Sequence, residues 1–140
     1  MAEGNYVYMM DMNKSVPADT DSISSLTAVI RDFVNRRDWQ QFHSPKDMAV
    51  AITAEASELL QLFVWKSSAE SHDIAERKRN LVADEMADVG ILLFELADIL
   101  QLNLGEIMLD KIQRNESRYP ADLSRGSNLK YNELPESPDA

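Results

Sequence analysis

The stretch Ala51–Trp65, AITAEASELLQLFVW, places two glutamates inside a run that is otherwise mostly apolar. Glu55 and Glu58 are three residues apart, so they share one face of a helix. That face also carries Ile52 and Leu59, and we therefore expect it to point toward a protein core. Burying an ionised carboxylate is costly unless another group compensates its charge. The stretch thus predicts a helix whose inward face needs a cationic partner.

A second acidic pair lies further along the chain. Glu85 and Asp88, within DEMADVGILLF, are again three residues apart and share their face with the apolar residues Leu81 and Leu92. No lysine or arginine is interleaved on either acidic face, which leaves a divalent cation as the compensating group. Oxygen ligands suit Mg²⁺ or Mn²⁺ better than zinc or copper. The two pairs together predict a magnesium or manganese site formed by four carboxylates.

A solvated helix edge and a di-iron centre are the alternatives to such a site. A single acidic pair of this spacing is usually a solvated helix edge, although two such pairs inside apolar helices are harder to account for in that way. A di-iron carboxylate bundle requires a Glu-x-x-His pair from each of two helices. The histidines are His43 and His72, and neither has a glutamate three residues before it. The di-iron site is therefore largely excluded.

Composition and charge limit the class of protein. A chain of 140 residues with 44% hydrophobic residues can bury the core of one compact domain. The net charge of −10 disfavours nucleic-acid binding, which needs clustered basic side chains. The chain has no cysteine, and it shows neither a signal peptide nor a long apolar segment. We expect a soluble, cytoplasmic protein that binds neither nucleic acid nor membranes.

Apolar spacing predicts an all-α domain between two less regular ends. Ser44 and Pro45 are typical N-cap and first-turn residues of a helix, whereas no segment alternates as a strand would. Residues 1–21 show no clear period, residues 22–119 are expected to form the helical domain, and residues 120–140 an irregular tail. Within the domain we expect four helices, at about residues 22–37, 45–66, 74–102 and 105–119.

The acidic pairs belong to a longer motif, in which Glu-x-x-Glu and Glu-x-x-Asp are separated by 26 residues. Together with the segments RDWQQFHSPKDMAVAITAEASELLQLFVWK, DEMADVGILL, KIQRNESRYP and KYNELP, it resembles the MazG-like all-α nucleoside triphosphate pyrophosphohydrolases over residues 22–135. The resemblance implies a four-helix bundle that assembles as a homo-oligomer, commonly a dimer of dimers. It also implies Mg²⁺-dependent hydrolysis of a nucleoside triphosphate to the monophosphate and pyrophosphate, as in house-cleaning of dCTP or of related or modified deoxynucleotides.

The resemblance further implies roles for individual residues. The metal ligands and catalytic residues would be the four acidic residues, Glu55, Glu58, Glu85 and Asp88. Phosphate-side positions correspond to Lys111, Asn115 and Arg118, with Tyr119 beside them. Positions that line the nucleoside pocket correspond to Trp39, His43 and Trp65, and a tail segment that can reach a neighbouring site corresponds to Lys130 and Tyr131.

Several of these residues would also fit an ordinary structural role. Lys111 and Arg118 fit a solvated helix face, the two tryptophans fit a core, and His43 fits a local cap. Glu95 follows Asp88 by seven residues on the same face, which allows a further polar contact, but we expect it to be exposed or to lie at a subunit boundary.

Two positions leave the base preference open. An animal member of the family has a histidine where this chain has Ile30 and a tyrosine where it has Leu92, and both contribute to base recognition there. Their absence leaves the metal chemistry untouched but puts a preference for cytosine in doubt. One alternative hypothesis is therefore the same reaction with another base. Another is a non-catalytic acidic helical protein that binds a nucleotide or a protein partner, and the intact acidic pairs count against it.

Overall fold

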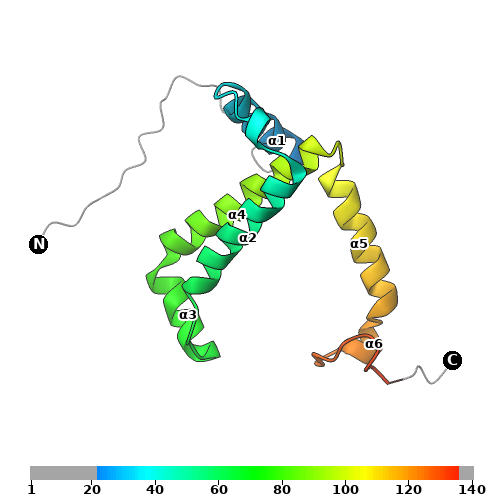
Figure 1. Cartoon of the computed structure of the whole chain (residues 1–140). Helices are drawn as coiled ribbons and strands as arrows, with labels where there is room; N and C mark the ends of the chain where they lie inside the picture. The colour runs from blue at the N-terminus through cyan, green and yellow to red at the C-terminus, as the bar shows by residue number, and fades with distance from the viewer. Residues whose placement is uncertain (1–21, 136–140) are drawn as a thin grey trace, which may run out of the picture.

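The chain folds into helices joined by short connections. A computed structural model describes residues 22–135, so the predicted N-terminal segment 1–21 and residues 136–140 lie outside the described part. Within residues 22–135 there is no strand, which confirms the predicted all-α class. The elements in chain order (Figure 1) are α1 (Ile23–Asn35), the 3-10 helix η1 (Gln40–Phe42), α2 (Pro45–Gln61), α3 (Ser68–Arg77), α4 (Arg79–Ile99), α5 (Leu104–Arg118) and α6 (Ala121–Ser124).

Side-chain caps determine where helices begin. At α2 the Ser44 hydroxyl accepts a hydrogen bond from the backbone N–H of Asp47, and Pro45 occupies the first turn, as the sequence predicts. Asn103 starts α5 in the same way, with the N–H of Glu106 as the donor. These starts depend on neighbours in the chain, which is why the sequence indicates them closely.

The third predicted helix is wrong in its bounds, because two helices occupy this part of the chain. α3 begins earlier than expected, at Ser68, where Ser67 and Glu70 form a reciprocal capping box. It ends at Arg77, since Lys78 has φ −110° and ψ 29° and interrupts the helix before α4. The capping signal Ser-x-x-Glu stands in the sequence, but the segment has too few apolar residues for its period to reveal a helix.

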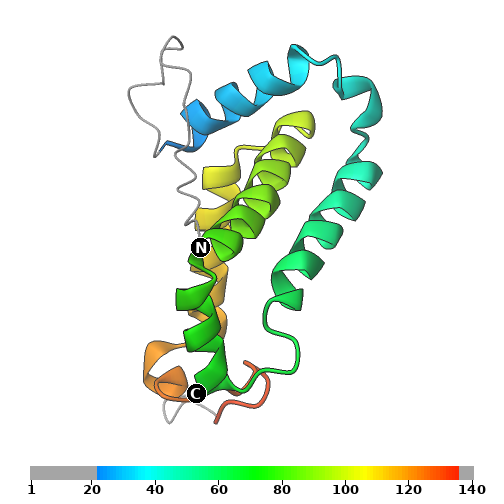
Figure 2. The same cartoon turned by 90° about the vertical axis from the view of Figure 1, so that its left-hand side faces the viewer.

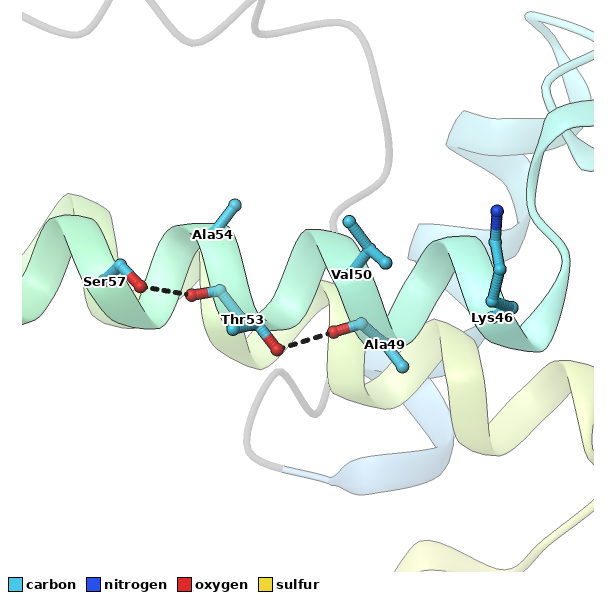
Figure 3. A pocket seen from close by; sticks show the side chains of 6 residues that line it. All are labelled: Lys46, Ala49, Val50, Thr53, Ala54 and Ser57. Carbon is cyan, nitrogen blue, oxygen red and sulfur yellow. Dashed lines mark hydrogen bonds between the residues drawn. The ribbon is translucent and has the colours of Figure 1, made fainter.

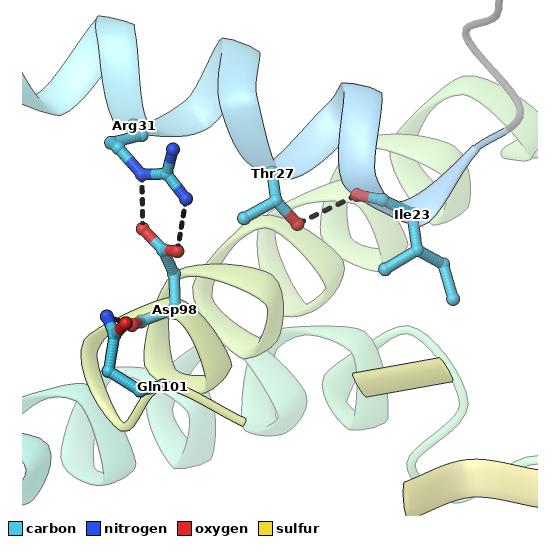
Figure 4. Close-up of polar contacts among 5 residues, drawn as sticks. All are labelled: Ile23, Thr27, Arg31, Asp98 and Gln101. Atoms are coloured by element: carbon cyan, nitrogen blue, oxygen red, sulfur yellow. Dashed lines mark hydrogen bonds and ion pairs between the residues drawn. The ribbon is translucent and has the colours of Figure 1, made fainter. Parts of the chain in front are cut away.

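α4 is the central helix, and α1, α2 and α3 all pack against it, as two perpendicular views show (Figures 1 and 2). Met48 of α2, with 2% of its surface exposed, is the most deeply buried side chain of the described residues. The Arg31 guanidinium of α1 donates two hydrogen bonds to the Asp98 carboxylate of α4, at 2.8 and 2.5 Å (Figure 4). Apolar packing and a bidentate ion pair therefore hold α1 and α2 on α4.

α5 departs from the predicted four-helix bundle. The short connection 100–103, in which Gln101 has φ 55°, turns the chain so that α5 runs away from α2 and α4 (Figure 1). Leu104 at the start of α5 is buried, but the apolar side chains further along it are exposed, namely Ile107, Met108, Leu109 and Ile112. The described part of one chain thus has six α-helices and does not close into a four-helix bundle.

The C-terminal tail is not wholly irregular. The segment that the sequence predicts as irregular contains the short helix α6, and the residues after it, as far as residue 135, form turns.

The hydrophobic core of a single chain is small. The buried hydrophobic side chains of the described residues are few, namely Val34, Met48, Ile74, Ala97 and Leu104. No helix within residues 22–135 is long and apolar enough to cross a membrane.

Candidate functional site

Three acidic side chains meet between α2 and α4. Glu55 and Glu58 of α2 and Glu85 of α4 each offer a carboxylate oxygen, and these oxygens all lie within 4.8 Å of one another. The three side chains form an acidic triad. It arises because Glu55 and Glu58 share one helical face and α2 packs along α4. Carboxylate oxygens at this spacing can share one divalent cation.

Asp88, the fourth predicted ligand, lies beside the acidic triad. The group of mutually close oxygens does not include it, and its side chain is exposed on α4. Its charge nevertheless acts on Glu85, since it contributes to raising the pKa of that residue. The structure therefore brings three of the four predicted ligands together and leaves the fourth adjacent to them.

The electrostatics of the acidic triad favour a cation. Loss of hydration raises the pKa of Glu85 above its ordinary value, and the charges of Glu58 and Glu55 raise it further. Asp88 and Asp84 add smaller effects in the same direction. Among residues 22–135, no lysine or arginine forms an ion pair with the triad. A cation is thus the group that would relieve the mutual repulsion of these carboxylates.

The acidic faces are less buried than the sequence predicts. Glu55 and Glu85 are half-buried and Glu58 is exposed, although the surrounding apolar residues indicated an inward face. The reason is that packing of α2 against α4 covers only part of each side chain. In one chain the triad is accordingly reachable from solvent, as a site for a charged ligand must be.

Trp39 and His43 are neighbours in the connection between α1 and α2. The Trp39 ring stands edge-on to Phe33, with centroids 5.8 Å apart, and its centroid lies 6.3 Å from that of His43. Trp39 remains 41% exposed, so it is not simply a core residue. The structure thus brings together two of the three residues that the sequence assigned to a nucleoside pocket.

Glu95 is not exposed, which contradicts the first of the two positions expected for it; the other, a subunit boundary, stays a prediction. It is buried, with 7% of its surface accessible, and its Oε1 lies 2.5 Å from Nδ1 of His43. Periodicity could not reveal this contact, because the two residues are 52 positions apart in the chain. The available signal was its place seven residues after Asp88, on the face that carries the acidic pair.

Trp65 and Trp39 of one chain do not lie together. Trp65 follows the C-terminal end of α2, whereas Trp39 precedes the N-terminal end. Its side chain is 95% exposed and its backbone has φ 61°, an unusual value for a bulky residue. Trp65 therefore makes no core contribution, and within the described chain it cannot line a pocket together with Trp39.

A second group of predicted residues gathers at the end of α5. The Arg118 guanidinium lies 5.3 Å from the centre of the Tyr131 ring, and the rings of Tyr119 and Tyr131 meet edge-on at 6.1 Å. Arg118, Tyr119 and Tyr131 form a C-terminal cluster, with Lys130 next to it in the chain. Figure 1 shows this end of α5 well apart from α2 and α4.

Lys111 and Asn115 lie on α5, before the C-terminal cluster. Lys111 is exposed and Asn115 is half-buried. Both residues belong to α5, which runs away from the helices α2 and α4 that carry the acidic triad (Figure 1). The structure thus separates the predicted phosphate-side residues from the predicted metal ligands.

α2 has a second, exposed face with small side chains. Figure 3 shows a shallow hollow along this helix, lined by Lys46, Ala49, Val50, Thr53, Ala54 and Ser57. The hydroxyls of Thr53 and Ser57 donate to backbone oxygens one turn earlier, at 2.9 and 2.7 Å, so they present little polarity outward. Such a face allows close approach of another helix.

Comparison with known proteins finds relatives and a solved structure that are named as pyrophosphatases. It is 41% identical to dCTP pyrophosphatase 1 of Rattus norvegicus and 40% identical to that of Homo sapiens, over 106 residues in each case. These matches cover 74% of this chain but 62% of each relative. A solved pyrophosphatase from Archaeoglobus fulgidus is similar with a TM-score of 0.68 and 38% identity, over 70% of this chain and 92% of that one.

The family assignment agrees with the positions of the acidic residues. The sequence profile of the MazG-like family matches residues 50–134, a range that contains the acidic triad, Asp88 and all of α5. This range is more than half of the 140 residues. The chain therefore belongs to the MazG-like family.

Proposed function

We propose that this chain is a nucleotide pyrophosphohydrolase that, with Mg²⁺ or Mn²⁺, cleaves a deoxynucleoside triphosphate to the monophosphate and pyrophosphate. The observation that carries the proposal is the acidic triad, whose carboxylate oxygens lie within 4.8 Å of one another between α2 and α4. The reaction named for the relatives, dCTP pyrophosphatase and pyrophosphatase, supports the same class.

The donor set of the site fits Mg²⁺ or Mn²⁺. It consists of carboxylate oxygens, the chain has no cysteine, and Nδ1 of His43 is occupied by Glu95. Mg²⁺ commonly takes a few carboxylates, keeps several waters and uses the remaining positions for phosphate oxygens. The exposure of Glu58 leaves such an open side. Glu55, Glu58, Glu85 and the adjacent Asp88 would hold the ion.

Phosphoanhydride cleavage depends on charge neutralisation and on a positioned water. Bound divalent cations supply positive charge at the phosphate oxygens and activate water. The residues of the chain fix where this happens: the acidic triad sets the position of the reacting phosphate. One of the four carboxylates, or a neighbouring group, would accept the proton of the attacking water. Lys111, Asn115 and Arg118 would bind the outer phosphates.

The nucleoside end of the substrate would lie at Trp39 and His43. An exposed tryptophan ring offers a stacking surface that every base can use. The names of the relatives support dCTP as the substrate. We include related or modified deoxynucleotides, with their removal as the physiological role, in the same proposal. Ile30 and Leu92 stand where an animal member of the family has base-recognising residues, so the same reaction with another base is the alternative.

We further propose that the chain acts as a homo-oligomer, a dimer of dimers. Two exposed surfaces support an assembly of copies. One is the apolar length of α5, where Leu109 is 62% exposed, and the other is the small-residue face of α2. A chain with so few buried hydrophobic residues gains stability by covering such surfaces.

Assembly would also complete the site. The C-terminal cluster and Lys111 belong to α5 and the tail after it, and α5 runs away from α2 and α4 (Figure 1), while Trp65 follows the end of α2 opposite to Trp39. If they contact the same substrate as the triad and Trp39, they come from a second copy. We propose that each site combines the acidic triad of one chain with these residues of another.

The decisive experiment is a pyrophosphate-release assay on a panel of deoxynucleoside triphosphates, with Mg²⁺ and after exhaustive treatment with EDTA. We expect pyrophosphate and the matching monophosphate, and no activity after chelation. Full activity without metal would overturn the role of the acidic triad. Nucleotide binding without pyrophosphate release from any triphosphate would favour a non-catalytic binding protein instead.

A further inference from the structure

Glu95 is a buried carboxylate to which the reaction assigns no role. It lies on α4 with 7% of its surface exposed, and it is the buried charged residue of the described chain. No lysine or arginine among residues 22–135 forms an ion pair with it, and Arg31, which lines the same small cavity, is engaged by Asp98. Its hydrogen-bond partner is His43, at 2.5 Å between Oε1 and Nδ1.

This contact determines which nitrogen of His43 carries hydrogen. When Glu95 is ionised it can only accept a hydrogen bond, and Nδ1 is then the donor toward it. In the neutral ring Nε2 then has no hydrogen and presents a lone pair. The opposite tautomer would place the lone pair of Nδ1 against the carboxylate, which is repulsive. Glu95 therefore selects one tautomer of His43.

The pair lies further along the face of α4 that carries Asp88. Glu95 follows Asp88 by seven residues on the same face of α4, which is about 10 Å along the helix axis. That separation is similar to the distance from the phosphate nearest the sugar to the far edge of a base. On the other side, the His43 ring has the half-exposed Trp39 as its neighbour, with centroids 6.3 Å apart.

We propose that Glu95 is a positioning residue for base selection: by holding Nδ1–H of His43, it makes Nε2 an acceptor for the amino group of the base. This proposal rests on the proposed function and deepens it. An acceptor favours cytosine or adenine, which present an amino group on the edge where uracil or thymine presents a carbonyl oxygen. The selectivity of the site is thus set by a residue that does not itself touch the substrate.

A purely structural tether is the competing role for Glu95. One turn further along α4, Asp98 holds Arg31 and ties α1 to α4 without any tautomer to select (Figure 4). Glu95 would, by analogy, only tie the α1–α2 connection to α4. Asp98→Asn is therefore the matched control, since it weakens a tether of α4 and leaves His43 and Glu95 in place.

The first test observes the ring directly and needs no turnover. The chain has two histidines, so ¹⁵N-histidine NMR of the full chain at mildly alkaline pH, with His72→Asn for assignment, resolves His43. We expect Nδ1–H with an unprotonated Nε2 in the wild type, in Glu95→Gln and in Asp98→Asn, because a glutamine oxygen can also accept. Glu95→Ala should lose this preference. A wild-type ring protonated at Nε2, whether neutral or cationic, would overturn the proposal.

The second test measures selectivity with α,β-imido analogues of dCTP and dUTP in the presence of Mg²⁺. Glu95→Ala should weaken binding of the dCTP analogue about tenfold, the scale of one lost hydrogen bond, and leave the dUTP analogue nearly unchanged. His43→Ala should do the same, and the double variant should lose no more. Equal losses for both analogues, or additive losses in the double variant, would show a tether only. Because neither test uses hydrolysis, a failure of the proposed reaction remains distinguishable.

Discussion

Trp39 and Trp65 lie at opposite ends of α2, separated by its 17 residues, which correspond to about 25 Å of helix. Both side chains are exposed, by 41% and 95% respectively. One nucleoside is too short to contact both within a chain. A site that uses both tryptophans must therefore combine residues from two copies.

Mixing two inactive variants tests such a shared site. Glu58→Gln removes a carboxylate of the acidic triad, and Trp65→Ala removes a residue that we assign to the site of another copy. Each variant alone should be nearly inactive, whereas a mixture that is unfolded and refolded together should regain activity, because some sites then combine intact parts. The measurement is pyrophosphate release. A mixture of Glu58→Gln with Glu85→Gln is the control, since both changes fall in the same part of the site; recovery there, or none in the first mixture, would contradict the shared site.

The exposed apolar length of α5 predicts an interface. Leu109 is 62% exposed, and Leu109→Asp should place a charge in the contact between copies. We expect the assembly to dissociate and the melting temperature to fall. Light scattering at micromolar concentration measures the mass, and Ser117→Asp, at an exposed polar position on another side of the same helix, is the control. A strictly monomeric wild type would argue against the assembly altogether.

Glu58→Gln should separate activity from stability. The change keeps size and hydrogen-bonding ability but removes one negative charge from the acidic triad. We expect turnover to fall by at least about 100-fold, the scale of losing one electrostatic contact in a reaction site. Helicity should be unchanged, and the melting temperature without metal should rise because repulsion is relieved. Glu76→Gln on α3 is exposed and serves as the control. Wild-type turnover and metal affinity in Glu58→Gln would mean that the acidic pairs have been misinterpreted.

The raised pKa of Glu85 predicts a particular pH dependence. Loss of hydration and neighbouring carboxylates raise this pKa in the folded chain above its unfolded value. The folded state therefore binds the proton more tightly, so the contribution of Glu85 to stability without metal is present at low pH and is lost as pH rises through the raised pKa. Mg²⁺ competes with that proton, and its affinity should fall as pH is lowered through the same range.

Melting temperatures without metal, and Mg²⁺ affinities by calorimetry, check this dependence between mildly acidic and neutral pH. Other carboxylates titrate in the same range, and the pKa of Asp98 is lowered by Arg31, which acts in the opposite direction. The useful quantity is therefore the difference between the wild type and Glu85→Gln. If the two share one pH profile, Glu85 does not have the environment that the acidic triad implies.

Local features of the fold were predictable from the sequence, and contacts between distant segments were less so. Ser44 and Pro45 define the start of α2 through neighbouring backbone groups, so the sequence suffices there. The interruption at Lys78 has neither glycine nor proline to announce it. The course of α5 depends on the backbone angle at Gln101, which periodicity does not report.

The same division applies to the site. The spacing of Glu55 and Glu58 already placed them on one face, and their meeting with Glu85 required only that α2 pack on α4. The partnership of His43 and Glu95 could not be predicted, because a helical period describes neighbours in one helix and says nothing of a loop residue 52 positions away.

The isolated course of α5 has a consequence for hydrogen exchange. A helix of 15 residues that lacks packing partners is only marginally stable in water. In the described chain α5 has such partners mainly at Leu104, whereas α2 and α4 cover each other. In the proposed assembly other copies cover α5, and dilution dissociates them. Backbone amides of α5 should therefore exchange with solvent faster as the protein is diluted, while those of α2 and α4 respond less. Because Lys111 and Arg118 lie on α5, the order of the phosphate-side residues would then depend on protein concentration.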